Sequence, residues 1–239
     1  MPDKPPANSA PQVAAPQGPS KLTIVLGFLA IGGCLVILGV IADGVKTQEA
    51  DALDTIATPL VHQFASPTLD AFMNDVTALG SNQGLVVLWA IAVICLVVLR
   101  RRRDATLVTV ALAGSVAINA LMKAFFERPR PQLAWATVLP DFSFPSGHSM
   151  DSVVFYFVVA LLVWQIAGPK AGFAAAVAAL VLVLLIGLSR IYLGYHYFTD
   201  VLGGYIAGVL WLTVVVSAFS GRQRIRAWRD VRQAATARS

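Results

Sequence analysis

The residues best suited to chemistry lie in the segment SRIYLGYHYFTD, which runs from Ser189 to Asp200. His196 and Asp200 are four residues apart, so on a helical turn they share one face. A carboxylate beside one imidazole nitrogen fixes the tautomer and leaves the other nitrogen to act as a nucleophile or base. Arg190 adds a cation to the same segment. The alternative is a plain His–Asp pair that closes the start of a helix.

A second group of basic residues occurs in the segment KAFFERPRP, residues 123–131. Its two prolines lack a backbone N–H and push Arg128 and Arg130 out of helical geometry. We therefore expect the chain to leave a helix in extended form, with Arg130 held beside Lys123. Two fixed cations suit a phosphate dianion, because arginine supplies a planar fork and lysine a point charge. A basic cap that snorkels at a helix end is the alternative.

The segment FPSGHSM, residues 144–150, has the features of an anion site at the start of a helix. Pro145 and Ser146 open the helix, and Gly147 lets a ligand approach the backbone closely. Free amides at a helix start attract anions, and the Ser146 hydroxyl can add a donor. His148 then lies in the first turn, beside any bound anion. The alternative is a serine N-cap followed by a surface histidine.

Long apolar stretches surround these three segments. Hydrophobic residues make up 57% of the 239 residues and charged residues 13%, with a mean hydropathy of +0.71. This composition excludes a disordered chain and a charged nucleic-acid binder, although the net charge is +5. Six stretches are apolar and long enough to span a bilayer: 22–42, 84–99, 105–124, 148–167, 171–188 and 201–219. The sequence therefore predicts an all-α, polytopic membrane protein with six transmembrane helices.

The remaining segments complete the expected organisation around a membrane domain at 22–220. Residues 1–21 are rich in Pro, Ala, Gln and Ser, and we expect a disordered cytoplasmic tail. Acidic and apolar residues alternate through 43–83, which predicts one or two amphipathic helices against the outer surface, between the first two spans. Residues 221–239 form a basic cytoplasmic tail expected to contact anionic lipid.

The distribution of basic residues predicts the orientation in the membrane. With both termini in the cytoplasm, 13 of the 18 lysines and arginines lie on the cytoplasmic side, as the positive-inside rule requires. Lys123, Arg130 and Arg190 then lie on the outer face, where that rule disfavours them. His148 and His196 fall on the same face. The topology therefore predicts that all three segments meet on one side of the membrane.

Together the three segments resemble the signature of the type 2 phosphatidic acid phosphatase superfamily. Its parts are Lys-x₆-Arg-Pro at 123–131, Pro-Ser-Gly-His at 145–148 and Ser-Arg-x₅-His-x₃-Asp at 189–200. The resemblance covers roughly residues 120–200, and the six-span layout extends it over most of the chain. Within the superfamily, the chain is similar to bacterial membrane phosphatases of the phosphatidylglycerophosphatase B-like and undecaprenyl-pyrophosphate phosphatase-like kinds.

The resemblance implies a metal-independent phosphatase with no cofactor. His196 would attack phosphorus and form a phosphohistidine, while Asp200 holds its imidazole. His148 would protonate the departing oxygen and then activate water. The groups implied to bind the phosphate are Lys123, Arg130, Ser146, Gly147 and Arg190. No group of acidic or histidine residues has the spacing of a metal site.

The implied substrate is a lipid phosphate whose tails remain in the bilayer of an inner membrane, with the phosphate on the periplasmic side. Candidates are phosphatidylglycerophosphate, phosphatidate, diacylglycerol pyrophosphate and undecaprenyl pyrophosphate, and the sequence does not choose among them. A lipid phosphotransferase would use the same histidine but would need an acceptor-binding segment. A non-catalytic transporter or scaffold would need ionisable residues near the bilayer midplane, or a broken catalytic set.

Asp151 departs from the family pattern, in which glycine commonly follows Ser-Gly-His-Ser-Met. It lies three residues after His148, on nearly the same helix face, and we expect it to favour the protonated form of His148. This would move the upper limb of the pH–rate profile to higher pH. The alternative is an aspartate that pairs across a helix interface. Gly204 and Gly208 form a small-xxx-small pair, which we expect to pack helices within a monomer.

Overall fold

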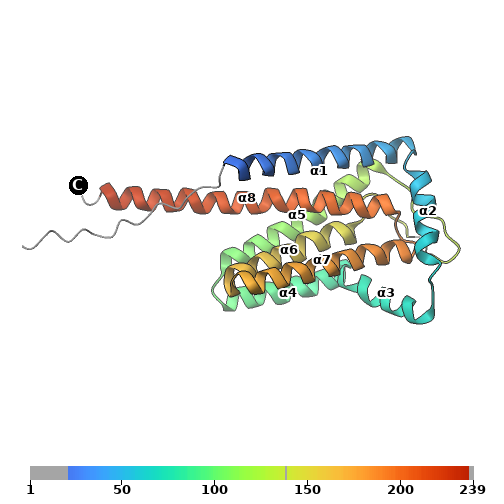
Figure 1. The fold of residues 1–239 in the computed structure, drawn as a ribbon. Coiled ribbons are helices and arrows are strands. Elements are labelled where there is room, and N and C mark those ends of the chain that lie inside the picture. Colours follow the sequence, from blue (N-terminus) through green and yellow to red (C-terminus); the bar gives the residue numbers. More distant parts are fainter. Residues whose placement is uncertain (1–20, 138, 237–239) are drawn as a thin grey trace, which may run out of the picture.

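The computed structural model describes residues 21–137 and 139–236, so the tail expected at 1–21 lies almost entirely outside the described residues. Within them the chain forms α-helices and no strands, which confirms the all-α prediction. In chain order the helices are α1 (Lys21–Thr47), α2 (Asp51–His62), α3 (Pro67–Leu79), α4 (Asn82–Val98), α5 (Arg102–Phe126), α6 (Gly147–Ala167), α7 (Pro169–Tyr192) and α8 (Phe198–Thr236). The longer helices run side by side, while α2 and α3 lie across one end of the bundle (Figure 1).

The candidate membrane spans follow the predicted layout. Five helical stretches in the described part are long and apolar enough to cross a bilayer: Gly27–Thr47 in α1, all of α5, α6 and α7, and Phe198–Gly221 in α8. The pair of α3 and α4 passes the same test, although the two helices are bent by 50° at their junction. The chain is therefore a multi-pass membrane protein, and its described residues contain five candidate spans, or six if the bent pair is one.

Several helix ends follow from local sequence signals. Ser66 precedes Pro67 and accepts a hydrogen bond from the amide of Leu69 at the start of α3. At the bend before α4, Ser81 accepts from the amide of Gly84 in the same way. Between α6 and α7 the turn is tight, because Gly168 alone separates the two helices and adopts a φ of 87°. At the other end of the chain, α8 runs past the boundary expected at residue 220.

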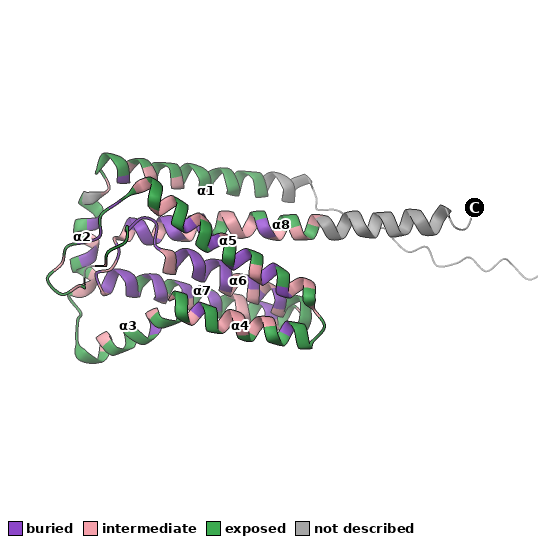
Figure 2. Ribbon diagram, turned by 180° about the vertical axis from the view of Figure 1, so that it is seen from behind, coloured by how far each residue is buried: buried purple, intermediate pink, exposed green. Residues whose placement is uncertain are grey.

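Helix α6 is the centre of the bundle and packs against α5, α7 and α8. Half of its apolar window is buried inside the protein, against 6% for the span in α1. Figure 2 shows this burial along α6 and at the neighbouring ends of α7 and α8, with exposed residues covering α1. The exposed surface carries many large apolar side chains, such as Phe28, Val40, Leu121 and Phe173. These side chains suit a lipid environment, where apolar groups have no reason to avoid the surface.

The segment between α1 and α4 forms two helices, α2 and α3, as the sequence predicts. Polar contacts fix this segment to the end of the bundle. In α2, Nδ1 of His62 lies 3.0 Å from the carbonyl oxygen of Tyr192 at the end of α7. The imidazole ring of His62 stacks on Trp135. Asp70 of α3 accepts a hydrogen bond of 2.5 Å from the Tyr192 hydroxyl. The segment is therefore a cap on the ends of the membrane helices, and we refer to α2 and α3 together as the cap.

The predicted small-residue pair on α8 packs within the monomer. A Cβ added to Gly208 would lie 2.8 Å from the carbonyl oxygen of Met150, and one added to Gly204 would lie 2.6 Å from that of Ser146. Both oxygens belong to backbone at the start of α6, which cannot move without shifting the helix. The two glycines thus allow α8 to approach the start of α6 closely.

Substitution of Gly208 by alanine should destabilise the protein by about 1–3 kcal/mol, because the added methyl group meets backbone and cannot be relieved by a side-chain rotation. Thermal unfolding in detergent would measure the loss. Gly39→Ala is the matched control, since a Cβ at Gly39 meets nothing within 4 Å. An equal melting temperature for Gly208→Ala and Gly39→Ala would contradict the close packing.

Candidate active site

A cavity of about 310 Å³ lies where the ends of α5 and α7 meet the starts of α4 and α6. Most of the residues singled out from the sequence line it: Lys123, Arg130, Gly147, His148, Asp151, Arg190 and His196. The fold thus brings together three segments that are far apart in the chain. Asp200 and Ser146 are fully buried and lie outside the lining.

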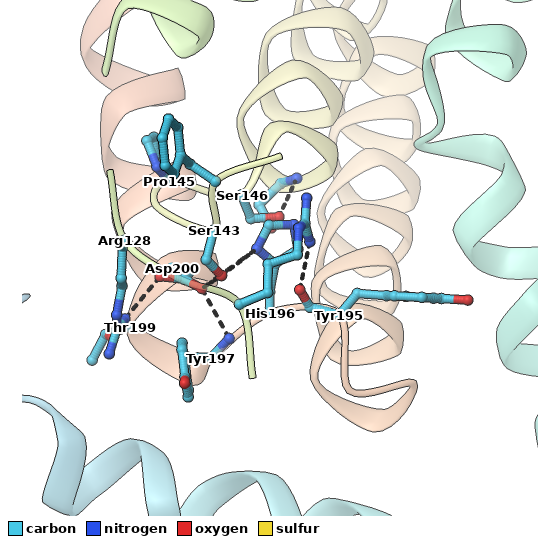
Figure 3. Close-up of polar contacts among 12 residues, drawn as sticks. Arg128, Ser143, Pro145, Ser146, Tyr195, His196, Tyr197, Thr199 and Asp200 are labelled. Carbon is cyan, nitrogen blue, oxygen red and sulfur yellow. Dashed lines mark hydrogen bonds and ion pairs between the residues drawn. The ribbon is translucent and has the colours of Figure 1, made fainter. Parts of the chain in front are cut away.

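His196 lies in the turn between α7 and α8 rather than on a helix. Two backbone hydrogen bonds to the carbonyl oxygen of Arg190, from the amides of Tyr195 and His196, form this turn. The imidazole Nδ1 lies 3.4 Å from Oδ2 of Asp200, so the expected pair is present although one partner precedes the helix. Figure 3 shows the ring edge directed towards Asp200 and Ser143.

The contacts of the imidazole fix its tautomer. Nη1 of Arg130 lies 3.2 Å from Nε2 of His196, and a guanidinium has only donors, so Nε2 is the nitrogen without a proton. Nδ1 then carries the proton and faces Asp200. Burial lowers the pKa of His196 well below its ordinary value, and the nearby cations, Arg190 foremost, lower it further. The result is a neutral imidazole whose lone pair lies on the side of the cations.

Ser143 belongs to the same group, although the motif spacing does not point to it. Its fully buried hydroxyl donates to Oδ2 of Asp200 and lies 3.3 Å from Nδ1 of His196. The amide of Tyr197 donates to the same carboxylate oxygen at 2.9 Å. Asp200 is thus held by several donors before it orients the histidine. Only the position of Ser143, two residues before Pro145, could have suggested that it belongs to the second segment.

Ser146 takes the alternative role considered for it. Its hydroxyl accepts from the amide of Ser149 at 3.4 Å and from the Ser149 hydroxyl at 3.1 Å, so it caps α6. Its amide donates to the carbonyl oxygen of Asp200, which joins the second segment to the third. Asn119 of α5, which the motifs do not include, donates to the carbonyl oxygen of Pro145 at 3.2 Å and holds the turn before α6. Ser146 therefore positions the cavity wall, and its role as a phosphate donor stays a prediction.

His148 lies in the first turn of α6, and Asp151 follows one turn deeper. Both line the cavity. The Asp151 carboxylate accepts a hydrogen bond from the Ser115 hydroxyl of α5. This contact matches the alternative of a pairing across a helix interface. The influence of Asp151 on the protonation of His148 stays a prediction.

Arg190 is buried at the end of α7 and lines the cavity. Its Nη1 donates to Thr77 of the cap at 2.8 Å, and its guanidinium stacks over the ring of Tyr195 at 4.3 Å. Its Nε is buried and has no hydrogen-bond partner. Because a buried charged donor without an acceptor is costly, this group is suited to bind an anion in the cavity.

Asp141 bridges the two other cations of the cavity, and the sequence motifs do not include it. Its carboxylate accepts from Lys123 at 2.6 Å and from Arg130 at 2.7 and 3.0 Å. Burial would raise the pKa of Asp141, but the hydrogen bond and charge of Lys123, together with Arg130, outweigh it and lower the pKa below its ordinary value. A charged carboxylate therefore lies between these two cations.

Comparison with known proteins identifies the family. A family model described as "PAP2 superfamily" matches residues 104–224, which span α5 to α7 and much of α8. Phosphatidylglycerophosphatase B of Bacillus subtilis is 34% identical over 188 residues, covering 77% of this chain and 88% of the relative. The chain belongs to the PAP2 superfamily. It is therefore related to lipid phosphatases.

Other PAP2 relatives extend the comparison. The putative undecaprenyl-diphosphatase YbjG of Escherichia coli is 31% identical over 134 residues, covering 52% of this chain and 64% of the relative. The crystal structure of a transmembrane PAP2-type phosphatidylglycerolphosphate phosphatase from Bacillus subtilis superposes with a TM-score of 0.74 at 28% identity, covering 80% of this chain and 96% of that one. Aquifex aeolicus LpxE gives a TM-score of 0.55 at 25% identity, covering 67% and 92% of the two chains.

The cavity is lined by basic side chains and imidazoles. Among residues 21–137 and 139–236, no three His, Cys, Asp or Glu side chains are placed to hold a metal ion. Among the described residues, three basic side chains line the cavity, those of Lys123, Arg130 and Arg190. Asp141 lies between two of them and offers the most direct test of how the site selects an anion.

Replacement of Asp141 by asparagine should strengthen the binding of inorganic anions, because it removes the charge that competes for the two cations. Both cations keep other partners, since Lys123 also donates to the carbonyl oxygen of Phe142 and Arg130 to that of Tyr195. We expect the inhibition constant of orthovanadate to fall by up to about tenfold, or about 1.4 kcal/mol. Glu127→Gln removes an exposed acid from the same loop and is the control. Unchanged or weaker vanadate binding in Asp141→Asn would contradict the competition.

Proposed function

We propose that this protein is a metal-independent lipid phosphatase that cleaves a phosphomonoester or diphosphate headgroup. The observation that carries the proposal is the pairing of a neutral imidazole with three basic side chains around one cavity in a PAP2 chain. The unpartnered Nε of Arg190 supports it, because an anionic oxygen would satisfy that donor.

The proposed reaction begins with attack by Nε2 of His196 on phosphorus. A phosphorus–nitrogen bond forms as the bond breaks between the terminal phosphorus and the oxygen that links it to the rest of the lipid, and His148 donates a proton to that oxygen. Arg130 must exchange its contact with Nε2 for a phosphate oxygen as the substrate enters. In the second step His148 removes a proton from water, the water oxygen attacks phosphorus, and the phosphohistidine bond breaks. The products are inorganic phosphate and the lipid alcohol from a phosphomonoester, or inorganic phosphate and the lipid monophosphate from a diphosphate.

The cations stabilise the charge that builds up on the three oxygens of the transferring phosphoryl group. Lys123 and Arg130 come from one side of the cavity and Arg190 from α7. The free amides at the start of α6 add further donors close to Gly147. Gly147 itself has little space for a side chain, because a Cβ there would lie 3.1 Å from Asn119. Because these donors are fixed by the fold, little reorganisation is needed during the reaction.

The proposed substrate is a lipid whose phosphate reaches the end of the membrane helices while its tails stay in the bilayer. Similarity to phosphatidylglycerophosphatase B favours phosphatidylglycerophosphate, and similarity to the putative undecaprenyl-diphosphatase favours undecaprenyl pyrophosphate. Phosphatidate and diacylglycerol pyrophosphate carry the same reacting groups. We place the protein in an inner membrane as a monomer, with both termini in the cytoplasm and the cavity facing the periplasm, on the basis of the positive-inside rule.

Substitution of His196 by alanine should abolish phosphate release, because no other nitrogen can form the intermediate at that position. The measurement is release of inorganic phosphate from the four lipids by detergent-purified protein, with excess EDTA present throughout. Wild-type protein should retain its activity in EDTA. Activity that requires Mg²⁺, or that survives in His196→Ala, would disprove the proposed mechanism.

The pH dependence should show a nucleophile that stays neutral in acid. Because burial and nearby cations lower the pKa of His196 from its usual value of about 6.5, the ring remains unprotonated as the pH falls below that value. The acid limb of the kcat/KM profile that reports this group should therefore lie well below pH 6.5. An acid limb at or above about pH 6.5 would show that the cations do not act on His196 in this way.

A further inference from the structure

A series of buried polar contacts joins the cap to the carboxylate behind the proposed nucleophile. Arg128 donates through Nη1 to Oδ1 of Asp200 at 2.8 Å and through Nη2 to Oδ2 of Asp54 at 2.7 Å. The side chain of Arg128 is 5% exposed, and those of the two aspartates are 0% exposed. Figure 3 shows Arg128 on the opposite side of Asp200 from His196.

Asp54 also fixes the first turn of α8 from the outside. Its Oδ1 accepts from the amide of Thr199 at 2.9 Å, and its Oδ2 accepts from the Thr199 hydroxyl at 2.6 Å. A side chain of α2 thus performs the capping role that usually falls to a residue of the same chain segment. The negative charge is also favourable at a helix N-terminus. The residue that follows Thr199 is Asp200.

Arg128 is directed at carboxylates rather than at the cavity. It does not belong to the cavity lining, and its guanidinium stacks on the ring of Tyr197 at 4.1 Å. Burial would lower the pKa of Arg128, but the charge of Asp200 and the contact with Asp54 outweigh it and raise the pKa. Arg128 is therefore a permanent counter-charge for two buried carboxylates, in contrast with Arg130 and Arg190.

The Arg128 fork is divided between two aspartates, and the oxygen of Asp200 to which it donates is not the one that faces the histidine. Arg128 occupies Oδ1, whereas Oδ2 faces Nδ1 of His196, the hydroxyl of Ser143 and the amide of Tyr197. Without Asp54, both arms of the guanidinium could turn to Asp200 in the bidentate geometry that arginine prefers. Oδ2 would then be shared with the arginine and drawn away from the imidazole.

We propose that Asp54 and Arg128 are positioning residues for His196, with Asp54 restraining Arg128 so that Asp200 keeps one carboxylate oxygen for the imidazole. This inference rests on the proposed role of His196 as the nucleophile. Asp54 belongs to the cap, which lies outside the region matched by the family model. The proposal therefore assigns the cap a part in the reaction. Removal of the charge of Asp54 or of Arg128 should have an effect, because it would leave the buried charge of the partner uncompensated.

The first test compares kcat with KM for Asp54→Asn and Arg128→Gln. Neither side chain meets the phosphate, so KM and the orthovanadate inhibition constant should stay within about twofold of wild type, while kcat falls by about 10-fold for Asp54→Asn and about 100-fold for Arg128→Gln. Arg128→Lys keeps the charge but not the fork, and should recover only part of the loss. Melting temperatures and gel filtration in detergent establish how much protein is folded.

Asp70→Asn is the matched control for the cap. It changes the same group in the same segment, and Asp70 bonds to Tyr192 rather than to the Arg128 network. We expect it to lower the melting temperature but not kcat. The double variant Asp54→Asn/Arg128→Gln should have the kcat of Arg128→Gln alone, because Asp54 acts through the arginine. Additive losses in kcat would overturn that order of action.

A second measurement does not depend on turnover. The chain has three histidines, so selective ¹⁵N labelling gives few signals, and His196→Ala identifies the one of interest. Wild-type His196 should be the neutral tautomer with its proton on Nδ1, and Asp54→Asn or Arg128→Gln should shift the ring away from that single tautomer. Spectra unchanged by both substitutions would overturn the proposal.

The outcomes for the two proposals are separable. If wild-type protein releases no phosphate, or if His196→Ala remains active, the phosphatase mechanism fails, while the tautomer measurement still decides whether Asp54 and Arg128 position the ring. If wild type is active and His196→Ala is not, kcat values near wild type for Arg128→Gln or Asp54→Asn refute the positioning role. Should Arg128→Gln fail to fold, the isosteric Asp54→Asn carries the same test.

Discussion

The site depends on the burial of one carboxylate, that of Asp200, at the end of a membrane bundle. A fully buried carboxylate is stable only if its oxygens are satisfied by hydrogen bonds and its charge by a cation. Here those partners come from the loop before α6, from the turn before α8 and from Arg128. The same bonds that make Asp200 tolerable in the interior also fix its direction. The orientation of His196 follows from that direction.

The membrane sets where this chemistry can occur. Apolar helices carry the bundle through the bilayer, and the charged groups of the site collect where those helices end. Several cations at one end repel one another, so acidic groups must lie among them. Asp141 does this for Lys123 and Arg130, and Asp54 and Asp200 do it for Arg128. One acid therefore faces the cavity, where we propose that a phosphate displaces it, while the other two are buried.

The cap and the close contact of α6 with α8 supply the rigidity that such a site needs. Gly204 and Gly208 let α8 approach the start of α6, and the amide of Ser146 reaches the carbonyl oxygen of Asp200 across that contact. From the other side, the cap holds Arg190 through Thr77 and the start of α8 through Asp54. Phosphoryl transfer relies mainly on positioning and on fixed charges, so a small displacement of these elements would weaken it.

Much of the protein could be predicted from its sequence, because the features concerned are local. Long apolar stretches mark the spans, and alternating acidic and apolar residues mark α2 and α3. Three short motifs contain every basic residue and histidine that lines the cavity. The glycine pair on α8 was also correctly predicted to pack within the monomer, because its four-residue spacing is visible in one helix.

Only the tertiary structure decided which charged group faces which. Asp54 lies 74 residues from Arg128, and nothing in the alternating pattern around it distinguishes it from the exposed acids of the same segment. Ser143 and Asp141 precede the second motif without belonging to it, and Ser146 belongs to it but caps a helix instead of lining the cavity. Sequence spacing determines which face of one helix a side chain occupies. Its partner across the bundle is set by how several helices and loops pack, because a buried charge takes the nearest group that can satisfy it.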